Sequence, residues 1–357
     1  MRRTPLDAWI AARLGIPIAD LGPEAVEARQ LEALRRTLAH AARHSPFYRQ
    51  RLTGLPTGFP ARRTDLATLP LSTAEDLAAH GEAMLCVSGG EIARVVTLET
   101  SGTSGPPKRL FFTPEDLEAT LDFFAVGIST LVGDGDVALV LLPGRRPEGV
   151  ADLLSRALPR IGAQAVLPPE PWTPGELARL LERADVTRMV AAPAQMRKLL
   201  DHAEFSRAAR LRVGAVLSSA EPLDGGLRSD LENTWDCKVF DHWGMTETGY
   251  GGGVECAAHA GYHPRLADLF LEVIDPRTAA PLPLGESGEL VVSTLNRRGL
   301  PLVRYRTGDA ARLLPGPCPC GSPLPRLETV PGRIELHDAG WRTVHPSKGQ
   351  RCICNDF

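Results

Sequence analysis

The chain has 357 residues, 43% of them hydrophobic, and a formal net charge of -3 at pH 7. This composition excludes a disordered chain and the strongly basic charge typical of nucleic-acid binders. No run reaches the roughly 20 apolar residues of a membrane span. Seven cysteines without a recognisable secretion signal predict reduced thiols in the cytoplasm.

Hydrophobic spacing predicts alternating helices and strands along most of the chain. An apolar stripe between residues 31 and 42 predicts an early amphipathic helix, and a later helix is expected at 114–132 with Thr113 as its N-cap. Strands are predicted at 94–98, 137–142, 164–167, 189–192, 213–217 and 238–241. This pattern favours an α/β fold of two packed subdomains, with mostly parallel sheets covered by helices on both faces.

The pattern changes after residue 268. Short apolar runs at 269–274, 288–294 and 302–305 are separated by Gly and Pro turns. Such runs predict a small antiparallel sheet or barrel beside the parallel sheets.

Residues 100–108 read Thr-Ser-Gly-Thr-Ser-Gly-Pro-Pro-Lys, which predicts a phosphate-binding loop. Gly102 and Gly105 let the backbone approach an anion, Ser101, Thr103 and Ser104 supply donors, and Lys108 supplies a positive charge. The alternative is an ordinary flexible linker, since the same residue types also form surface loops. The run lacks the Gly-Lys-Ser/Thr ending of the common nucleotide triphosphatases.

This run resembles the phosphate-binding motif of the acyl-adenylate-forming superfamily. Further matching motifs follow in order: Ser219-Ala220-Glu221-Pro222, Asp241-His242-Trp243-Gly244-Met245-Thr246-Glu247, Tyr305-Arg306-Thr307-Gly308-Asp309 and Gly332-Arg333. Segments at 45–49, 69–77 and 313–321 resemble the phenylacetate-CoA ligase branch in particular. The chain is therefore identified as a member of this branch, with the fold of its large N-terminal domain.

The resemblance implies a set of site residues. Lys108, Thr246, Glu247 and Arg333 would be catalytic, with Thr246 at the α-phosphate and Glu247 holding Mg²⁺. Asp309 would accept hydrogen bonds from the ribose. ATP would be held by Ser101, Gly102, Thr103, Ser104, Gly105, Lys108, Ala220, Glu221, Pro222, Asp241, His242, Trp243, Gly244, Met245, Thr246, Asp309 and Arg333.

The implied reaction is ATP-dependent adenylation of a carboxylic acid, aryl or related, followed by transfer to a thiol such as coenzyme A. Other acceptors stay open, including a coenzyme or a protein thiol such as Cys352 or Cys354. A third interpretation is a non-catalytic nucleotide-binding scaffold. Arg145 or Arg146 would pair with an acidic group on the substrate, unless they form an exposed pair at a turn.

Cysteines and histidines suggest a metal site. Cys256, His263, Cys318 and Cys320 form a Cys₃His set suited to structural zinc, and the resemblance raises this expectation. His259 is a competing ligand, and the alternative is a set of separate thiols.

We expect four regions: an N-terminal helical region (1–95), an α/β subdomain with the phosphate loop (96–240), a second subdomain with the zinc site (241–331) and a tail (332–357). Family members carry a mobile domain of about 100 residues after the Gly-Arg pair. The tail does not resemble it, which predicts doubtful thioester formation unless a separate protein supplies that domain. By analogy we also expect a homodimer.

Overall fold

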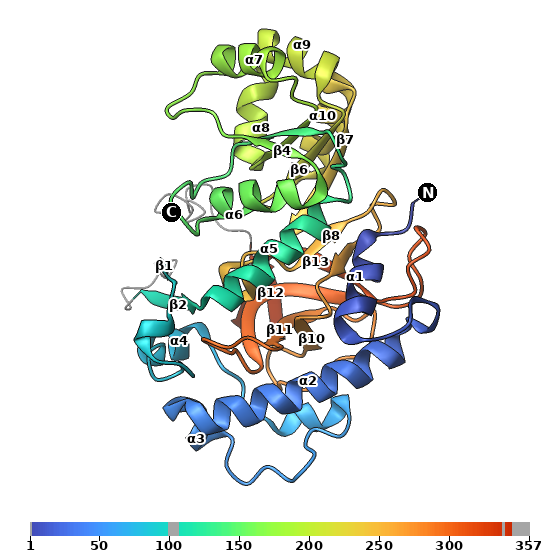
Figure 1. The fold of residues 1–357 in the computed structure, drawn as a ribbon. Coiled ribbons are helices and arrows are strands. Elements are labelled where there is room, and N and C mark those ends of the chain that lie inside the picture. The colour runs from blue at the N-terminus through green and yellow to red at the C-terminus, as the bar shows by residue number, and fades with distance from the viewer. Residues whose placement is uncertain (1, 99–106, 338–339, 345–357) are drawn as a thin grey trace.

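The computed structural model describes residues 2–98, 107–337 and 340–344, and one twelve-stranded sheet runs through most of it (Figure 1). The strand order is β10-β11-β12-β13-β9-β8-β7-β6-β5-β3-β4, with β14 paired to β13. The α/β fold class is confirmed. The predicted parallel and antiparallel parts form the two halves of this single sheet.

The parallel half consists of short buried strands between helices. Its strands are β3 (Val137–Val140), β4 (Gln164–Val166), β5 (Arg188–Ala191), β6 (Ala215–Ser218) and β7 (Lys238–Trp243). Its helices are α6 (Val150–Ala157), α7 (Pro174–Arg183), α8 (Pro193–Leu200), α9 (Ala203–Arg212) and α10 (Gly225–Trp235). Leu139 packs into one hydrophobic cluster with Phe205 and Trp235, whereas Val140 packs into another with Leu153. Side chains alternate across a strand, so helices cover both faces as predicted.

The antiparallel half is larger than the sequence pattern suggests. It contains β8 (Gly253–Glu255), β9 (Tyr262–Pro264), β10 (Leu269–Ile274), β11 (Gly288–Thr294), β12 (Tyr305–Leu314), β13 (Arg326–His337) and β14 (Gly340–Val344). The strands predicted at 269–274 and 288–294 have the predicted bounds. The strand predicted at 302–305 instead begins at Tyr305, because Arg304 takes a φ of 45° that interrupts the extended backbone.

The two halves meet at β7, which pairs in parallel with β6 and antiparallel with β8. The predicted boundary between residues 240 and 241 lies within this strand. Functional groups in open α/β sheets gather at the carboxyl ends of parallel strands. The motif Asp241–Glu247 therefore leaves the sheet at the point where its direction changes.

Helices of the N-terminal region surround the antiparallel half, where α2 lies against β11 (Figure 1). They are α1 (Pro5–Leu14), α2 (Pro23–His44), α3 (Pro46–Arg51) and α4 (Ala74–His80), with short 3₁₀ turns at Ile18–Asp20, Arg63–Thr68 and Gly89–Glu91. Within the part of the chain described here, no helix has both the length and the apolar character needed to cross a membrane.

A hairpin and a long helix connect these regions. Strand β1 (Arg94–Leu98) pairs with β2 (Lys108–Phe112), and α5 (Pro114–Ile128) follows. Thr113 caps α5 as predicted, because its hydroxyl accepts from the Asp116 backbone N–H. The sequence pattern did not predict β2. The phosphate-loop residues Ser101, Gly102, Thr103, Ser104 and Gly105 lie outside the described residues.

Candidate active site

Lys108 and Glu247 form a buried ion pair between two distant segments. Lys108 is the first residue of β2, and Glu247 lies in the 3₁₀ turn Thr246–Thr248 that follows β7. The Glu247 side chain is only 4% exposed. Its Oε1 also accepts a hydrogen bond from Tyr305 Oη at 3.2 Å. Lys108 and Tyr305, which belong to separate sequence motifs, therefore both contact the Glu247 carboxylate.

The pair keeps Glu247 ionised despite its burial. Burial raises the pKa of Glu247, but the Lys108 charge, the Lys108 hydrogen bond and the Tyr305 hydroxyl together lower it below its usual value. Burial and the Glu247 charge raise the pKa of Tyr305, so this phenol stays protonated and donates. A cation and a carboxylate held at one point suit a site for phosphate and Mg²⁺.

Asp309 and Arg333 form a second ion pair nearby. They are register partners on β12 and β13, and Arg333 Nη1 lies 2.5 Å from Asp309 Oδ1. Burial raises the pKa of Asp309, and among the charges that act on it are Arg333, Glu247 and Lys108. The four predicted residues thus share one electrostatic neighbourhood, which we call the charged centre.

A glycine makes room for this second pair. Gly308 has a φ of 73°, and a Cβ there would lie 2.6 Å from Arg333 Nη2. A larger residue would therefore need a strained backbone and a displaced guanidinium. Glycine is therefore needed before Asp309 so that the Arg333 guanidinium can reach the aspartate.

The motif on β7 is divided between accessible and packed positions. Asp241 accepts a hydrogen bond from Tyr262 Oη at 2.7 Å, and burial raises its pKa to about 6. Trp243 packs against Gly252, where a Cβ would lie 2.1 Å from its ring. Met245 packs on the cluster of the antiparallel half. Gly244 and Thr246 are accessible, in line with their predicted place beside the nucleotide.

The segment predicted to lie along adenine follows β6. Ala220 has a φ of 72° and is exposed, and Pro222 is exposed as well. Glu221 accepts a hydrogen bond from the Ala194 backbone N–H at 3.3 Å. The segment therefore forms an accessible turn at the carboxyl end of a parallel strand, which is the expected edge for a ligand.

An apolar pocket lies beside β7 and is lined mainly by α5, α6 and strand ends. Phe124, Leu154 and Leu217 are among its apolar walls. Three side chains with polar atoms also line it: Tyr250, and the pair Ser219 and His242, whose Oγ and Nδ1 lie 3.0 Å apart. Burial lowers the pKa of His242 to about 4, so the ring is neutral at physiological pH.

The two arginines considered for substrate binding do not line this pocket. Arg145 Nε lies 3.4 Å from Glu170 Oε1, an ion pair at the turn after β3. The lining of the pocket is therefore mostly apolar, with the Ser219–His242 pair as a hydrogen-bonding group.

Cys256, His263, Cys318 and Cys320 converge as the spacing suggested. All four are buried, and their ligand atoms lie within 4.8 Å of one another. Cys256 and Cys318 Sγ are 3.7 Å apart, and Cys320 Sγ is 3.6 Å from His263 Nε2. A tetrahedral zinc ion would place two sulfurs about 3.8 Å apart, and a sulfur and a nitrogen about 3.6 Å apart. These residues therefore fit zinc.

The competing ligand lies elsewhere. His259 Nδ1 is 3.2 Å from Glu255 Oε2 and 2.9 Å from Arg228 Nη1, outside the cluster. The four ligands come from the end of β8, from β9 and from the loop between β12 and β13. A bound ion would therefore connect three segments of the antiparallel half.

Two functional candidates were missed by sequence analysis. Tyr305 belongs to a recognised motif, so its position could have been noted, but its contact with Glu247 spans 58 residues. Arg297 donates from Nη1 to the Glu247 backbone carbonyl at 2.5 Å, and no motif signals it. Long-range contacts of this kind are not visible in local sequence patterns.

Comparisons with known proteins show the family to which the chain belongs. A family model described as AMP-binding enzyme matches residues 59–296. Phenylacetate-coenzyme A ligase of Pseudomonas putida is 30% identical over 330 residues, which are 89% of this chain and 73% of that protein. The ligase of the same name from Escherichia coli K12 is 26% identical, over 89% of this chain and 74% of that protein.

Solved structures show the same fold. The open conformation of 2-hydroxyisobutyryl-CoA ligase, in complex with 2-HIB-AMP and CoA, superposes with a TM-score of 0.77 at 21% identity. The match covers 90% of this chain and 79% of that one. On the family match and the sequence relatives together, the chain belongs to the AMP-binding enzyme family, in its phenylacetate-CoA ligase-like branch.

Proposed function

We propose that the chain activates an aromatic carboxylic acid with ATP, forming an acyl-adenylate and pyrophosphate at the charged centre. The observation that carries this proposal is the meeting of Lys108, Glu247, Asp309 and Arg333 from separate motifs. A substrate carboxylate oxygen attacks the α-phosphorus. The bond from this phosphorus to the bridging oxygen breaks, and its electron pair leaves with pyrophosphate.

The side chains would act by positioning and charge neutralisation. Lys108 would move from Glu247 to the phosphates, because its ammonium group gains a stronger anionic partner there. Asp309 would turn from Arg333 to the ribose hydroxyls. Arg333 would then be available to the phosphates, and no covalent enzyme intermediate is needed in this scheme.

Glu247 fits a magnesium ligand. It is buried and ionised, and Mg²⁺ commonly takes one or two carboxylates together with substrate phosphates. When bound, the ion would neutralise charge that develops on the phosphates. Thr246, on the accessible side of the same turn, is the neighbouring candidate for the α-phosphate.

The apolar pocket beside β7 is the proposed acyl site. It is lined by Phe123, Phe124 and Leu217, and by His242 of the motif that leads to Glu247. The pocket has a volume of about 40 Å³ in this structure, so an aromatic ring would bury against these walls once the surrounding side chains move apart to admit it. The Ser219–His242 pair would favour a substrate with one hydrogen-bonding ring substituent, since the other walls offer few polar partners.

The proposed second step transfers the acyl group to coenzyme A, which the names of the similar ligases support. Transfer to another coenzyme or to Cys352 or Cys354 stays a prediction, because both cysteines lie outside the described residues. Structural zinc at the Cys₃His cluster is also part of the proposal, supported by the tetrahedral spacing of its ligand atoms. Cytoplasmic location, a homodimer and a separate partner protein remain predictions.

ATP–pyrophosphate exchange would test the proposal, since it isolates adenylation from acyl transfer. Phenylacetate should support exchange at least about tenfold better than octanoate, which has the same number of carbons but no ring. Phenylacetamide, which lacks the attacking carboxylate, should support none. ATP binding without exchange for any aromatic acid would favour the scaffold interpretation instead.

A further inference from the structure

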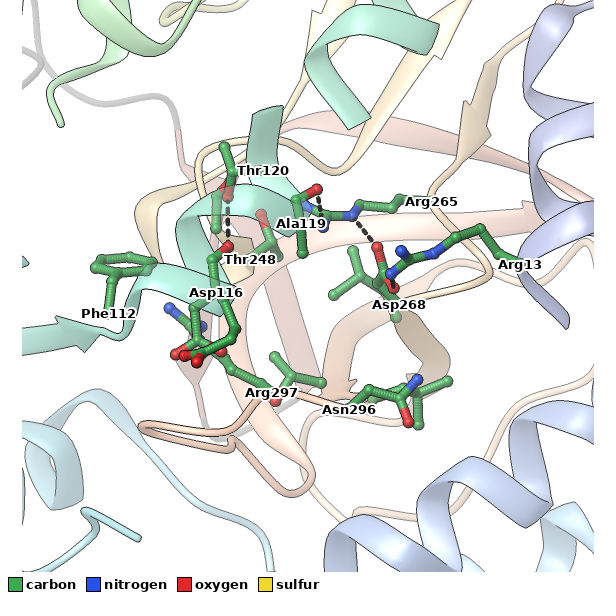
Figure 2. A pocket seen from close by; sticks show the side chains of 15 residues that line it. Arg13, Phe112, Asp116, Ala119, Thr120, Thr248, Arg265, Asp268, Asn296 and Arg297 are labelled. Atoms are coloured by element: carbon green, nitrogen blue, oxygen red, sulfur yellow. Dashed lines mark hydrogen bonds and ion pairs between the residues drawn. The ribbon is translucent and has the colours of Figure 1, made fainter. Parts of the chain in front are cut away.

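A second pocket lies on the other side of the Glu247 turn. It is lined by residues of α1, β2 and α5 and by the segment 294–297 after β11, and it has a volume of about 70 Å³ (Figure 2). A water molecule needs roughly 10–15 Å³ on this measure. The pocket therefore holds a few waters or one small ion, but no nucleotide or coenzyme.

Arg297 is the lining arginine of this pocket that has no ion pair among the described residues. The residue is 9% exposed, it takes part in none of the ion pairs found among the described residues, and its Nη2 has no hydrogen-bond partner there. Burial lowers its pKa, the charges of Asp116 and Glu247 oppose this, and the neighbouring Arg265 charge lowers the pKa further. A buried cation without a paired anion is costly.

The carboxylates around the pocket are already engaged. Asp116 accepts from the backbone N–H groups of Thr113, Arg298 and Gly299 at 2.9–3.1 Å. Figure 2 shows Asp268 between two guanidinium groups, and it accepts from Arg265 at 2.7 Å and Arg13 at 2.9 Å.

The formal charges that line the pocket balance, but one lining arginine has no ion-pair partner. Three guanidinium groups (Arg13, Arg265, Arg297) and three carboxylates (Glu115, Asp116, Asp268) line it. Asp268 pairs with Arg265 and with Arg13, so Arg297 is the lining arginine without an ion pair among the described residues. A single small anion beside its Nη2 would supply that partner.

Arg297 also contacts two of the segments that form the charged centre, the Glu247 turn and the strand of Lys108. Its Nη1 donates to the Glu247 carbonyl, and its guanidinium carbon lies 4.6 Å from the centre of the Phe112 ring. Phe112 ends the strand that Lys108 begins. The group that lacks an anion is therefore the one that connects the Lys108 strand to the Glu247 turn.

We propose that this pocket binds one small monovalent anion, such as chloride or bromide, against Arg297. The bound anion neutralises the guanidinium and thereby steadies the Glu247 turn. Anion binding and its effect on the stability of the fold stand apart from the proposed adenylation.

Thermal unfolding of the full chain, without ATP, tests the binding. Gluconate is too large for the pocket, so it is exchanged for chloride at constant ionic strength. The wild type should gain about 2 °C in a saturable manner, because the anion binds the folded state. Arg297→Gln should lose the saturable gain. Arg212→Gln, at an arginine that is ion-paired with Asp185 away from the pocket, should keep it.

Equal chloride responses of the wild type and Arg297→Gln would overturn the proposal. Crystals of the wild type in sodium bromide give a second test that holds even if Arg297→Gln fails to fold. An anomalous peak beside Arg297 Nη2 is expected, and a pocket without one would overturn the proposal. If the anion binds but no acid supports pyrophosphate exchange, the proposed function fails while the site stands.

Discussion

The charged centre and the Cys₃His cluster both bring together residues from distant parts of the chain, but their side chains are arranged differently. In the charged centre, each charge is paired with another side chain: Lys108 with Glu247, and Asp309 with Arg333. In the proposed function, a substrate replaces these partners. In the cluster, four buried ligand atoms face one another at the spacing of a closed tetrahedron.

The two sites differ in how far their side chains are exposed, which separates exchangeable contacts from permanent ones. Ion pairs that open to admit ATP need partial access, and the Lys108 and Asp309 side chains are 18% and 25% exposed. The three cysteines and His263 are no more than 4% exposed, so no substrate would reach them. Loss of a cluster ligand should therefore lower stability, whereas loss of a residue in the centre should lower activity.

The largest effect is expected from the cluster. Cys318→Ser should lose bound zinc and destabilise the chain by on the order of 5 kcal/mol, or roughly 10 °C in Tm, because one ligand of a closed shell is missing. Cys237→Ser, at another buried cysteine, should keep its zinc. Elemental analysis and thermal unfolding measure both. Wild-type protein without stoichiometric zinc would contradict the assignment.

The next effect should appear in adenylation. Lys108→Ala should reduce pyrophosphate exchange by about 10²–10³-fold, the size of losing one transition-state charge contact. It should also lower Tm, since Glu247 would be left buried without its cation. Lys238→Ala, an exposed lysine at the start of β7, serves as the control. Exchange rates of Lys108→Ala close to those of Lys238→Ala would place the phosphates elsewhere.

Asp309→Asn should have a smaller effect, mainly on ATP binding. Loss of charged hydrogen bonds to the ribose should raise KM for ATP about tenfold, with a lesser change in kcat. Steady-state exchange at varied ATP measures the two constants. A fall in kcat with no change in KM would argue that Asp309 acts on the phosphates and not on the ribose.

The smallest effect concerns pH. Burial holds the pKa of His242 at about 4, against 6.5 for an unperturbed histidine. As pH falls from 6.5 towards 4, His242 becomes protonated in the unfolded chain but stays neutral in the folded protein. Protonation therefore favours the unfolded chain, and His242 lowers the stability of the fold in that pH range. His242→Gln should flatten the decline of Tm across it. An unchanged profile would show that His242 protonates freely in the folded protein.

Much of the fold followed from local patterns. The alternation of apolar runs located the parallel strands, and Gly and Pro turns marked the change near residue 269. Strand β2 was not predicted, because Lys108–Phe112 forms through pairing with β1 and not through an alternating pattern of its own. The union of both halves into one sheet depends on β7 pairing with β8, a contact that local sequence does not specify.

Site residues could be predicted from the sequence where they belong to a recognised motif. The structure brings together the ligand atoms of the four cluster residues, which were named from sequence. Glu247 and Asp309 were also named from sequence, and their places beside Mg²⁺ and the ribose stay predictions. Tyr305 and Arg297 were not named as site residues, because each acts on Glu247 through a contact between segments more than 40 residues apart. The Arg297 bond also reaches a backbone carbonyl, which carries no sequence signal.

The measurement that tests the central claim most directly is identification of the nucleotide product by mass spectrometry. The chain is mixed with MgATP and phenylacetate without any thiol, and the bound and released species are separated. The account predicts phenylacetyl-adenylate on the protein and an equal amount of pyrophosphate. Formation of ADP and phosphate, with no acyl-adenylate, would contradict it.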